Sequence, residues 1–149
     1  MTDISFYHLT STSLDDALPK LLEKSLQAGF RVQVKTADEV ESERLASWLW
    51  NYSPDTFLPH GTTKDGLEAE QPIFISSNWE NRNAATLLLV LAGEVPPAID
   101  GFTRMLDMFN GADAEQTQQA RTRWKQYSTA GNALTYFRQT PSGSWEKQS

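Results

Sequence analysis

The sequence predicts a single α/β domain with parallel strands over residues 1–149. Strand-like runs alternate with stretches of helical periodicity along most of the chain, the order that builds parallel strands joined by helices. A chain of 149 residues has the size of one ordinary domain. Hydrophobic residues make up 39% of it and aromatic residues 11%, which suffices for a packed core. No repeat, low-complexity tract or linker divides it.

The first 36 residues have the pattern of a β-α-β unit. Residues 4–9 are a short β-like run, and residues 31–36 alternate between apolar and polar side chains as a strand does. Between them, Ser13 is placed to cap a helix that Gly29 ends. Pro19 fits if that helix starts one turn later or if its first turn is loosely wound. Five leucines form its apolar stripe: Leu14, Leu18, Leu21, Leu22 and Leu26.

The middle of the chain predicts a second helix, a long loop and two strands. The helix covers about residues 38–51, and the loop covers residues 52–71 around an aromatic centre at 57–61. Long loops inside compact domains are often functional. Residues 72–76 form a strand, and after a polar loop the apolar run within 85–92 predicts a central strand buried on both faces.

The last third predicts two helices and a hairpin. Apolar residues at helical spacing favour a helix over 102–109, before Asn110-Gly111. Asp113 and Gln116 resemble a capping box that begins a helix running to about 130, closed by Gly131. Residues 134–137 and 145–147 flank a turn at 141–143, which indicates a C-terminal hairpin.

The composition excludes several classes of function. Without cysteine there is no disulfide, thiol nucleophile or thiolate metal site, and the two histidines lie far apart in the chain. A net charge of −6 argues against DNA binding driven by phosphate contacts. The N-terminus lacks a signal-peptide pattern, and the apolar run 87–92 is too short to span a bilayer. We therefore expect a soluble, cytoplasmic protein that needs no metal, cofactor or membrane.

Signs of catalysis are weak. No nucleophile elbow, Walker A loop or dinucleotide-binding glycine motif follows a strand. The turn at 9–13 is rich in hydroxyls and could hold a phosphate at the helix N-terminus, although capping explains it better. His8 in a strand is expected to be structural, whereas His60 in the long loop is a better candidate for a site. We expect no catalytic site.

Two groups of residues indicate binding surfaces. In the helix that starts at Asp113, five residues at helical spacing share one face: Thr117, Arg121, Trp124, Lys125 and Ser128. A cationic and aromatic face in an acidic protein suits a short acidic peptide with a hydrophobic residue and a terminal carboxylate. A solvated helix face explains the same pattern about equally well. Trp50 and Phe57 are hard to bury and suggest a second interface.

At these residues the chain resembles the chi subunit of DNA polymerase III. The matching segments occur in order along the chain: Phe6-Tyr7-His8-Leu9, Leu49-Trp50, Phe57-Leu58-Pro59-His60, Ala120-Arg121-Thr122-Arg123-Trp124-Lys125-Gln126-Tyr127 and Ala130-Gly131. The resemblance implies a Rossmann-like domain of three layers without a nucleotide site. It also implies a strand, not a helix, at 102–109.

The resemblance further implies a non-catalytic adaptor in DNA replication. Chi proteins bind the acidic C-terminal tail of single-stranded DNA-binding protein, which ends in Pro-Phe, and the psi subunit, which tethers them to the clamp loader. Contact with DNA is then indirect. The residues that match the tail site are Arg121 for the terminal carboxylate, Trp124 for the phenylalanine pocket, Lys125 for the aspartates, Phe109 as an apolar pocket residue, and Thr117 where some relatives have lysine.

Trp50 and Phe57 match the psi-facing surface, which is also a candidate site for a repair helicase. Two rival interpretations stay open. The first is a Rossmann-like protein that binds a small molecule or nucleotide at the 10–13 turn and His60. The second is a direct binder of single-stranded DNA, with Trp124 and Arg121 stacking on bases.

Overall fold

The computed structural model describes residues 2–52, 58–91, 93–99 and 101–148. Within these ranges, eight strands form one sheet in the order β3-β4-β2-β5-β6-β1-β7-β8. Neighbouring strands are parallel except in the final β7–β8 hairpin. The elements are β1 (Asp3–Leu9), α1 (Leu14–Gln27), β2 (Val32–Lys35), α2 (Glu39–Asn51), β3 (His60–Thr62), β4 (Ile73–Ser76), β5 (Leu87–Val90), β6 (Arg104–Asn110), α3 (Ala114–Thr129), β7 (Ala133–Gln139) and β8 (Trp145–Gln148).

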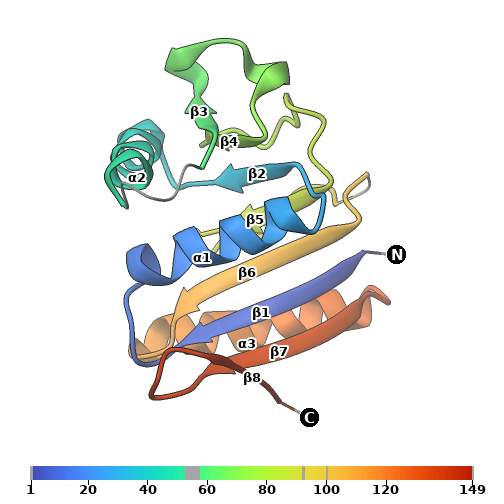
Figure 1. The fold of residues 1–149 in the computed structure, drawn as a ribbon. Helices are drawn as coiled ribbons and strands as arrows, with labels where there is room; N and C mark the ends of the chain where they lie inside the picture. The colour runs from blue at the N-terminus through green and yellow to red at the C-terminus, as the bar shows by residue number, and fades with distance from the viewer. Residues whose placement is uncertain (1, 53–57, 92, 100, 149) are drawn as a thin grey trace.

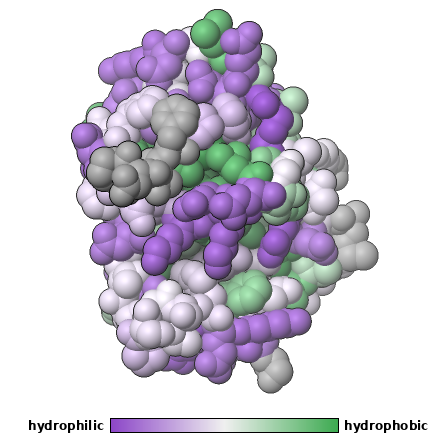
Figure 2. Space-filling view, viewed as in Figure 1, coloured by the Kyte–Doolittle hydropathy of each residue, from purple (hydrophilic) through white to green (hydrophobic). Residues whose placement is uncertain are grey.

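The helices cover both faces of the sheet, as Figure 1 shows: α1 and α2 pack on one face and α3 on the other. Alternation along β1 supplies both cores, because successive side chains of a strand point to opposite faces. Ile4 and Phe6 join the core under α3, and Tyr7 and Leu9 join the core under α1. The outer side of α1 is hydrophilic (Figure 2). The predicted mostly parallel α/β fold of three layers, with its C-terminal hairpin, is confirmed.

Helix α1 runs through Pro19 without a break. Proline has no main-chain N–H, so the carbonyl of Asp15, four residues earlier, loses its helical donor. The indole Nε1 of Trp48 on α2 donates to that carbonyl at 2.7 Å. One side chain thus replaces the missing hydrogen bond and joins α2 to α1. The helix starts at Leu14, not one turn later, with Ser13 as its cap.

Helices α1 and α3 end as predicted. Gly29 follows α1 with φ of 91° and Gly131 follows α3 with φ of 88°, a region that favours glycine. After each glycine, a main-chain N–H donates back into the last turn, from Phe30 to the carbonyl of Ser25 and from Asn132 to that of Tyr127.

The helix predicted from periodicity at 102–109 is wrong. Residues 104–110 form β6, which confirms the strand implied by the family resemblance. Strand β6 lies between β5 and β1 with a core on each face, so Met105, Leu106, Met108 and Phe109 are all buried. A strand with two apolar faces loses the alternating pattern and places apolar residues at spacings that also fit a helix.

The long loop predicted at 52–71 is only partly irregular. It contains β3, which adds a strand at the edge of the sheet beside β4, and two short 3-10 turns at 63–65 and 68–70. A strand of three residues between a proline-rich stretch and a turn has too little alternation to be recognised from sequence. The predicted interface residue Phe57 lies outside the described residues.

Candidate peptide-binding site

A pocket of about 660 Å³ lies between α3 and the β1–β7–β8 end of the sheet. Three of its lining side chains are cations and none is an acid, although the protein carries a net charge of −6. The lining residues are His8, Gln118, Arg121, Thr122, Trp124, Lys125, Tyr136, Arg138 and Gln148. Among the described residues, the six ion pairs involve none of these three cations. The lining of the pocket therefore carries a local excess of positive charge.

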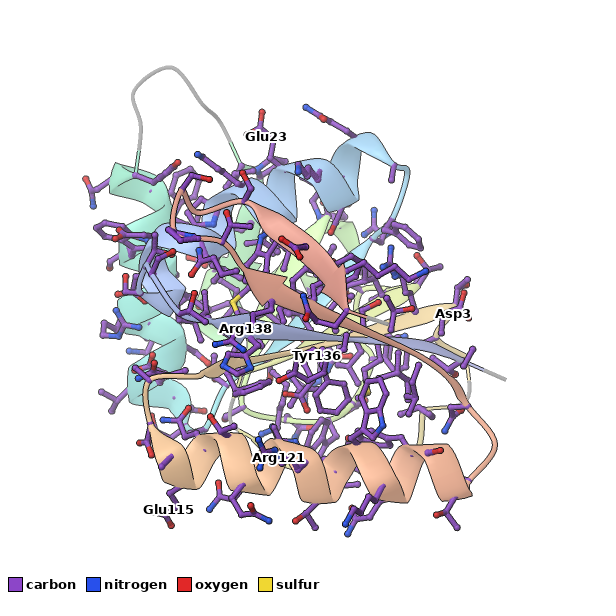
Figure 3. The ribbon with its side chains drawn as sticks, turned by 90° about the horizontal axis from the view of Figure 1, so that it is seen from below. Asp3, Glu23, Glu115, Arg121, Tyr136 and Arg138 are labelled. Carbon is purple, nitrogen blue, oxygen red and sulfur yellow. The ribbon has the colours of Figure 1, made fainter. Side chains whose placement is uncertain are left out.

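The register of the sheet brings the strand side chains of the pocket together. His8 on β1 is paired with Phe109 on β6 and with Arg138 on β7, which forms one row across three strands. Tyr136 lies two residues before Arg138, and strand alternation places both on the face covered by α3. Figure 3 shows Arg121 on α3, with Tyr136 and Arg138 on the strand that passes over it.

Helix α3 contributes Arg121, Trp124 and Lys125 to the same pocket. Arg121 and Lys125 are exposed, whereas Trp124 is half-buried. The indole packs edge-on against Phe6, with ring centroids 5.4 Å apart, and against Tyr136, with centroids 5.7 Å apart. Aromatic pairs at these distances and angles are favourable. They fix the ring of Trp124 beside two exposed cationic side chains.

His8 forms the floor of the pocket. Its Nδ1 lies 2.5 Å from the Tyr136 hydroxyl. Burial, followed by the charges of Arg138 and Arg121, lowers the pKa of His8, and a main-chain hydrogen bond with Gly111 acts in the opposite direction. The neutral imidazole is therefore favoured at pH 7. A Cβ at Gly111 would lie 2.0 Å from His8 Nε2, so the ring occupies space that a side chain at Gly111 would need.

Of the five residues predicted for the tail site, three line the pocket and two do not. Arg121, Trp124 and Lys125 line the pocket. Phe109 is buried behind His8, with ring centroids 5.0 Å apart, and does not line it. Thr117 does not line the pocket either. Its hydroxyl donates to the carbonyl of Asp113, 3.0 Å away at the start of α3.

Sequence reasoning did not assign six of the lining residues to a site: His8, Gln118, Thr122, Tyr136, Arg138 and Gln148. His8 was expected to be structural, Tyr136 was assigned only to a hairpin, and Arg138 lies just beyond the strand predicted at 134–137. Alternation along two strands could have grouped them, since His8 shares a face with Phe6, and Arg138 shares one with Leu134 and Tyr136. Their meeting with α3 depends on β7 pairing beside β1, which no local pattern predicts.

A buried ion pair sets the rotation of α3. Arg123 Nε donates to Asp107 Oδ2 at 2.7 Å, and its Nη2 donates to Oδ1 at 2.9 Å. The remaining Nη1 donates to the carbonyl of Gly93 at 3.1 Å. Asp107 belongs to β6 and is fully buried. Arg123 is thus joined to the sheet, while Arg121 and Lys125, each two residues away, lie on a different face of α3 and line the pocket.

Comparison with known proteins decides the family. Residues 1–135 match the family model described as DNA polymerase III chi subunit, HolC. The chain belongs to this family. It is thus an accessory subunit of DNA polymerase III, which acts in DNA replication.

Three chi relatives match over most of their length. A probable DNA polymerase III subunit chi of Rickettsia prowazekii (strain Madrid E) is 28% identical over 154 positions, which cover 99% of this chain and 92% of the relative. The chi subunit of Pseudomonas aeruginosa is 28% identical, covering 90% of this chain and 94% of its own. That of Haemophilus influenzae is 29% identical, covering 85% and 90%.

The second surface predicted for this chi chain lies at the other end of the sheet. Trp50, in the last turn of α2, is 54% exposed, and its ring centroid lies 4.3 Å from that of His60. His60 is buried, with Nδ1 2.6 Å from the carbonyl oxygen of Leu58 and Nε2 3.0 Å from that of Ala46. His60 therefore supports the packing of β3 on α2 and is not available to a substrate.

The turn proposed for a rival nucleotide site is already occupied by a protein side chain. Gln139 Oε1 accepts the main-chain N–H groups of Thr10, Ser11 and Thr12 at 3.0–3.1 Å. Its Nε2 donates to the hydroxyl of Thr12 at 2.8 Å. These amides are the groups that would hold a phosphate. The structure also does not bring His60 to this turn.

In the described part of the chi chain, no group of three or more acidic, histidine or cysteine side chains is arranged to hold a metal ion. Within the same ranges, no helix is long and apolar enough to cross a bilayer.

Proposed function

We propose that this chi chain is a non-catalytic adaptor that binds the acidic C-terminal tail of single-stranded DNA-binding protein in the pocket under α3. The observation that carries the proposal is a pocket with three cations, an aromatic wall and no lining acid. His8 and His60, the two histidines, are engaged by Tyr136 and by main-chain carbonyls, so neither supports a catalytic reading.

The chemistry of the pocket fits a peptide that ends in Pro-Phe. An exposed guanidinium can take a terminal carboxylate through two parallel hydrogen bonds, and we assign this role to Arg121, which lines the pocket. The phenyl ring of the last residue can pack against the fixed ring of Trp124. Lys125, one residue further along α3, is placed to attract the aspartates that precede the apolar end.

We propose that the surface around Trp50 receives psi and, through psi, the clamp loader, or alternatively a repair helicase. A half-exposed tryptophan is typical of the centre of an interface. Trp50 lies on α2, whereas the strands that line the tail pocket, β1, β7 and β8, lie at the far end of the sheet from β3 (Figure 1). The two partners can therefore be held at once, which is what an adaptor requires. The role proposed for Phe57 concerns a residue outside the described ranges.

Calorimetry with an acidic peptide that ends in Pro-Phe tests the tail site. Arg121→Ala should weaken binding by about 2 kcal/mol or more, roughly 30-fold, because the terminal carboxylate loses its partner. Lys64→Ala is the control, since it removes one exposed positive charge beside β3, at the opposite end of the sheet. Binding should also weaken as salt is added. Equal affinity of Arg121→Ala and wild type, or no binding by wild type, would contradict the assignment.

A further inference from the structure

We propose that Arg138 is a second anion-binding residue of the pocket, and that it acts with Arg121 to select a peptide that carries side-chain carboxylates as well as a terminal one. This inference rests on the proposed tail-binding function and adds a specificity-determining residue to it. It concerns a residue on β7, whereas Arg121 and Lys125 belong to α3.

Arg138 and Arg121 line the pocket from two different elements, β7 and α3. Arg138 is paired in register with His8 on β1, and it lies on the same face of β7 as Tyr136. Both arginines are exposed and both line the pocket. His8 and Tyr136 line the same pocket, with His8 Nδ1 2.5 Å from the Tyr136 hydroxyl. A peptide that enters the pocket therefore meets one guanidinium from α3 and one from β7.

The electrostatics of the floor agree with this arrangement. The charges of Arg138 and Arg121 both lower the pKa of His8, after the larger effect of burial. Burial raises the pKa of the Tyr136 hydroxyl, and the same two arginines oppose that rise. Both guanidinium groups thus act on the same two side chains. Within the described ranges, neither arginine belongs to an ion pair, so their charges are available to an acidic ligand.

The family match ends before this part of the pocket. It covers residues 1–135, whereas Tyr136, Arg138 and Gln148 follow it. Gln148 on β8 is paired with Tyr136, so the C-terminal hairpin builds one whole side of the pocket. The selectivity that we assign to Arg138 consequently belongs to a part of the pocket that the family model does not cover.

The test is a double comparison of two peptides and three proteins by calorimetry. The first peptide is acidic and ends in Pro-Phe, and the second has each aspartate replaced by asparagine. The proteins are wild type, Arg138→Ala and Lys147→Ala. Lys147 is the matched control, because it lies on the same hairpin, is exposed, and is paired with Phe137 on the opposite face of the sheet. Thermal unfolding of each variant verifies that the fold is retained.

We expect Arg138→Ala to bind the acidic peptide about threefold to tenfold more weakly than wild type, as for a partly exposed charge pair. The asparagine peptide should show a smaller loss, and Lys147→Ala should match wild type. Arg121→Ala is measured in the calorimetry that tests the tail site. If Arg138→Ala binds the acidic peptide like wild type while Arg121→Ala loses it, the role of Arg138 is refuted and the tail site stands. Equal losses for both peptides also refute it. If wild type binds neither peptide, the proposed function fails and this inference fails with it.

Discussion

The buried pair of Arg123 and Asp107 allows a prediction whose size follows from the structure. Arg123→Ala removes two hydrogen bonds of 2.7 and 2.9 Å from a carboxylate that is 0% exposed, and one of 3.1 Å from the Gly93 carbonyl. Removing one partner of such a pair leaves an uncompensated charge and costs about 3–5 kcal/mol. That is a large part of the roughly 5–15 kcal/mol that stabilises a typical domain.

Urea unfolding followed by circular dichroism measures this loss as a lower free energy of unfolding. In thermal unfolding, the melting temperature of a chain of this size should fall by about 2–4 °C per kcal/mol, or roughly 6–20 °C in all. Arg121→Ala is the natural control, because it lies two residues away on the same helix but is exposed, and should change stability by less than about 0.5 kcal/mol. The two variants should thus differ: Arg123→Ala loses stability, whereas Arg121→Ala loses peptide affinity.

A second variant tests whether the stability lost in Arg123→Ala comes from the unpaired charge or from lost packing. Combining Arg123→Met with Asp107→Leu removes both charges while keeping apolar volume, and should recover most of the stability lost in Arg123→Ala. A cost below about 1 kcal/mol for Arg123→Ala would refute the reasoning. A double variant no more stable than Arg123→Ala would refute it as well, since the loss would then come from packing.

Two further predictions concern other parts of the molecule. Burial and the facing charges of Arg138 and Arg121 hold the pKa of His8 below 6.5, so the folded state disfavours protonation of the ring. The stability advantage of wild type over His8→Gln should therefore shrink as the pH falls below 6.5. Urea titrations at several pH values test this, and an advantage that grows on acidification would contradict it. On α2, Trp50→Ala should weaken binding to purified psi by about tenfold or more, whereas Val40→Ala, an 80% exposed residue of the same helix, should not; equal binding by both variants would remove Trp50 from the interface.

Local patterns were sufficient for most elements of the fold. Ser13 caps α1 and Asp113 caps α3 as predicted, because a cap depends on a side chain and the amides two or three residues later. The face shared by Arg121, Trp124 and Lys125 was likewise predictable, since helical spacing alone places them together. The strand at 104–110 was missed by periodicity for the opposite reason. Its burial on both faces comes from neighbours that are distant in sequence.

The sequence by itself determined the α/β class, the helix ends and a cationic, aromatic face on the last helix, because each depends on contacts within a few residues. Only the tertiary structure decided that His8 and Arg138 meet that face, through strand pairings that join residues about 130 positions apart. It also decided that Arg123 is buried beside Asp107 while Arg121, two residues earlier, is exposed. Spacing shows which residues share a side of a helix or strand, but packing decides what that side faces.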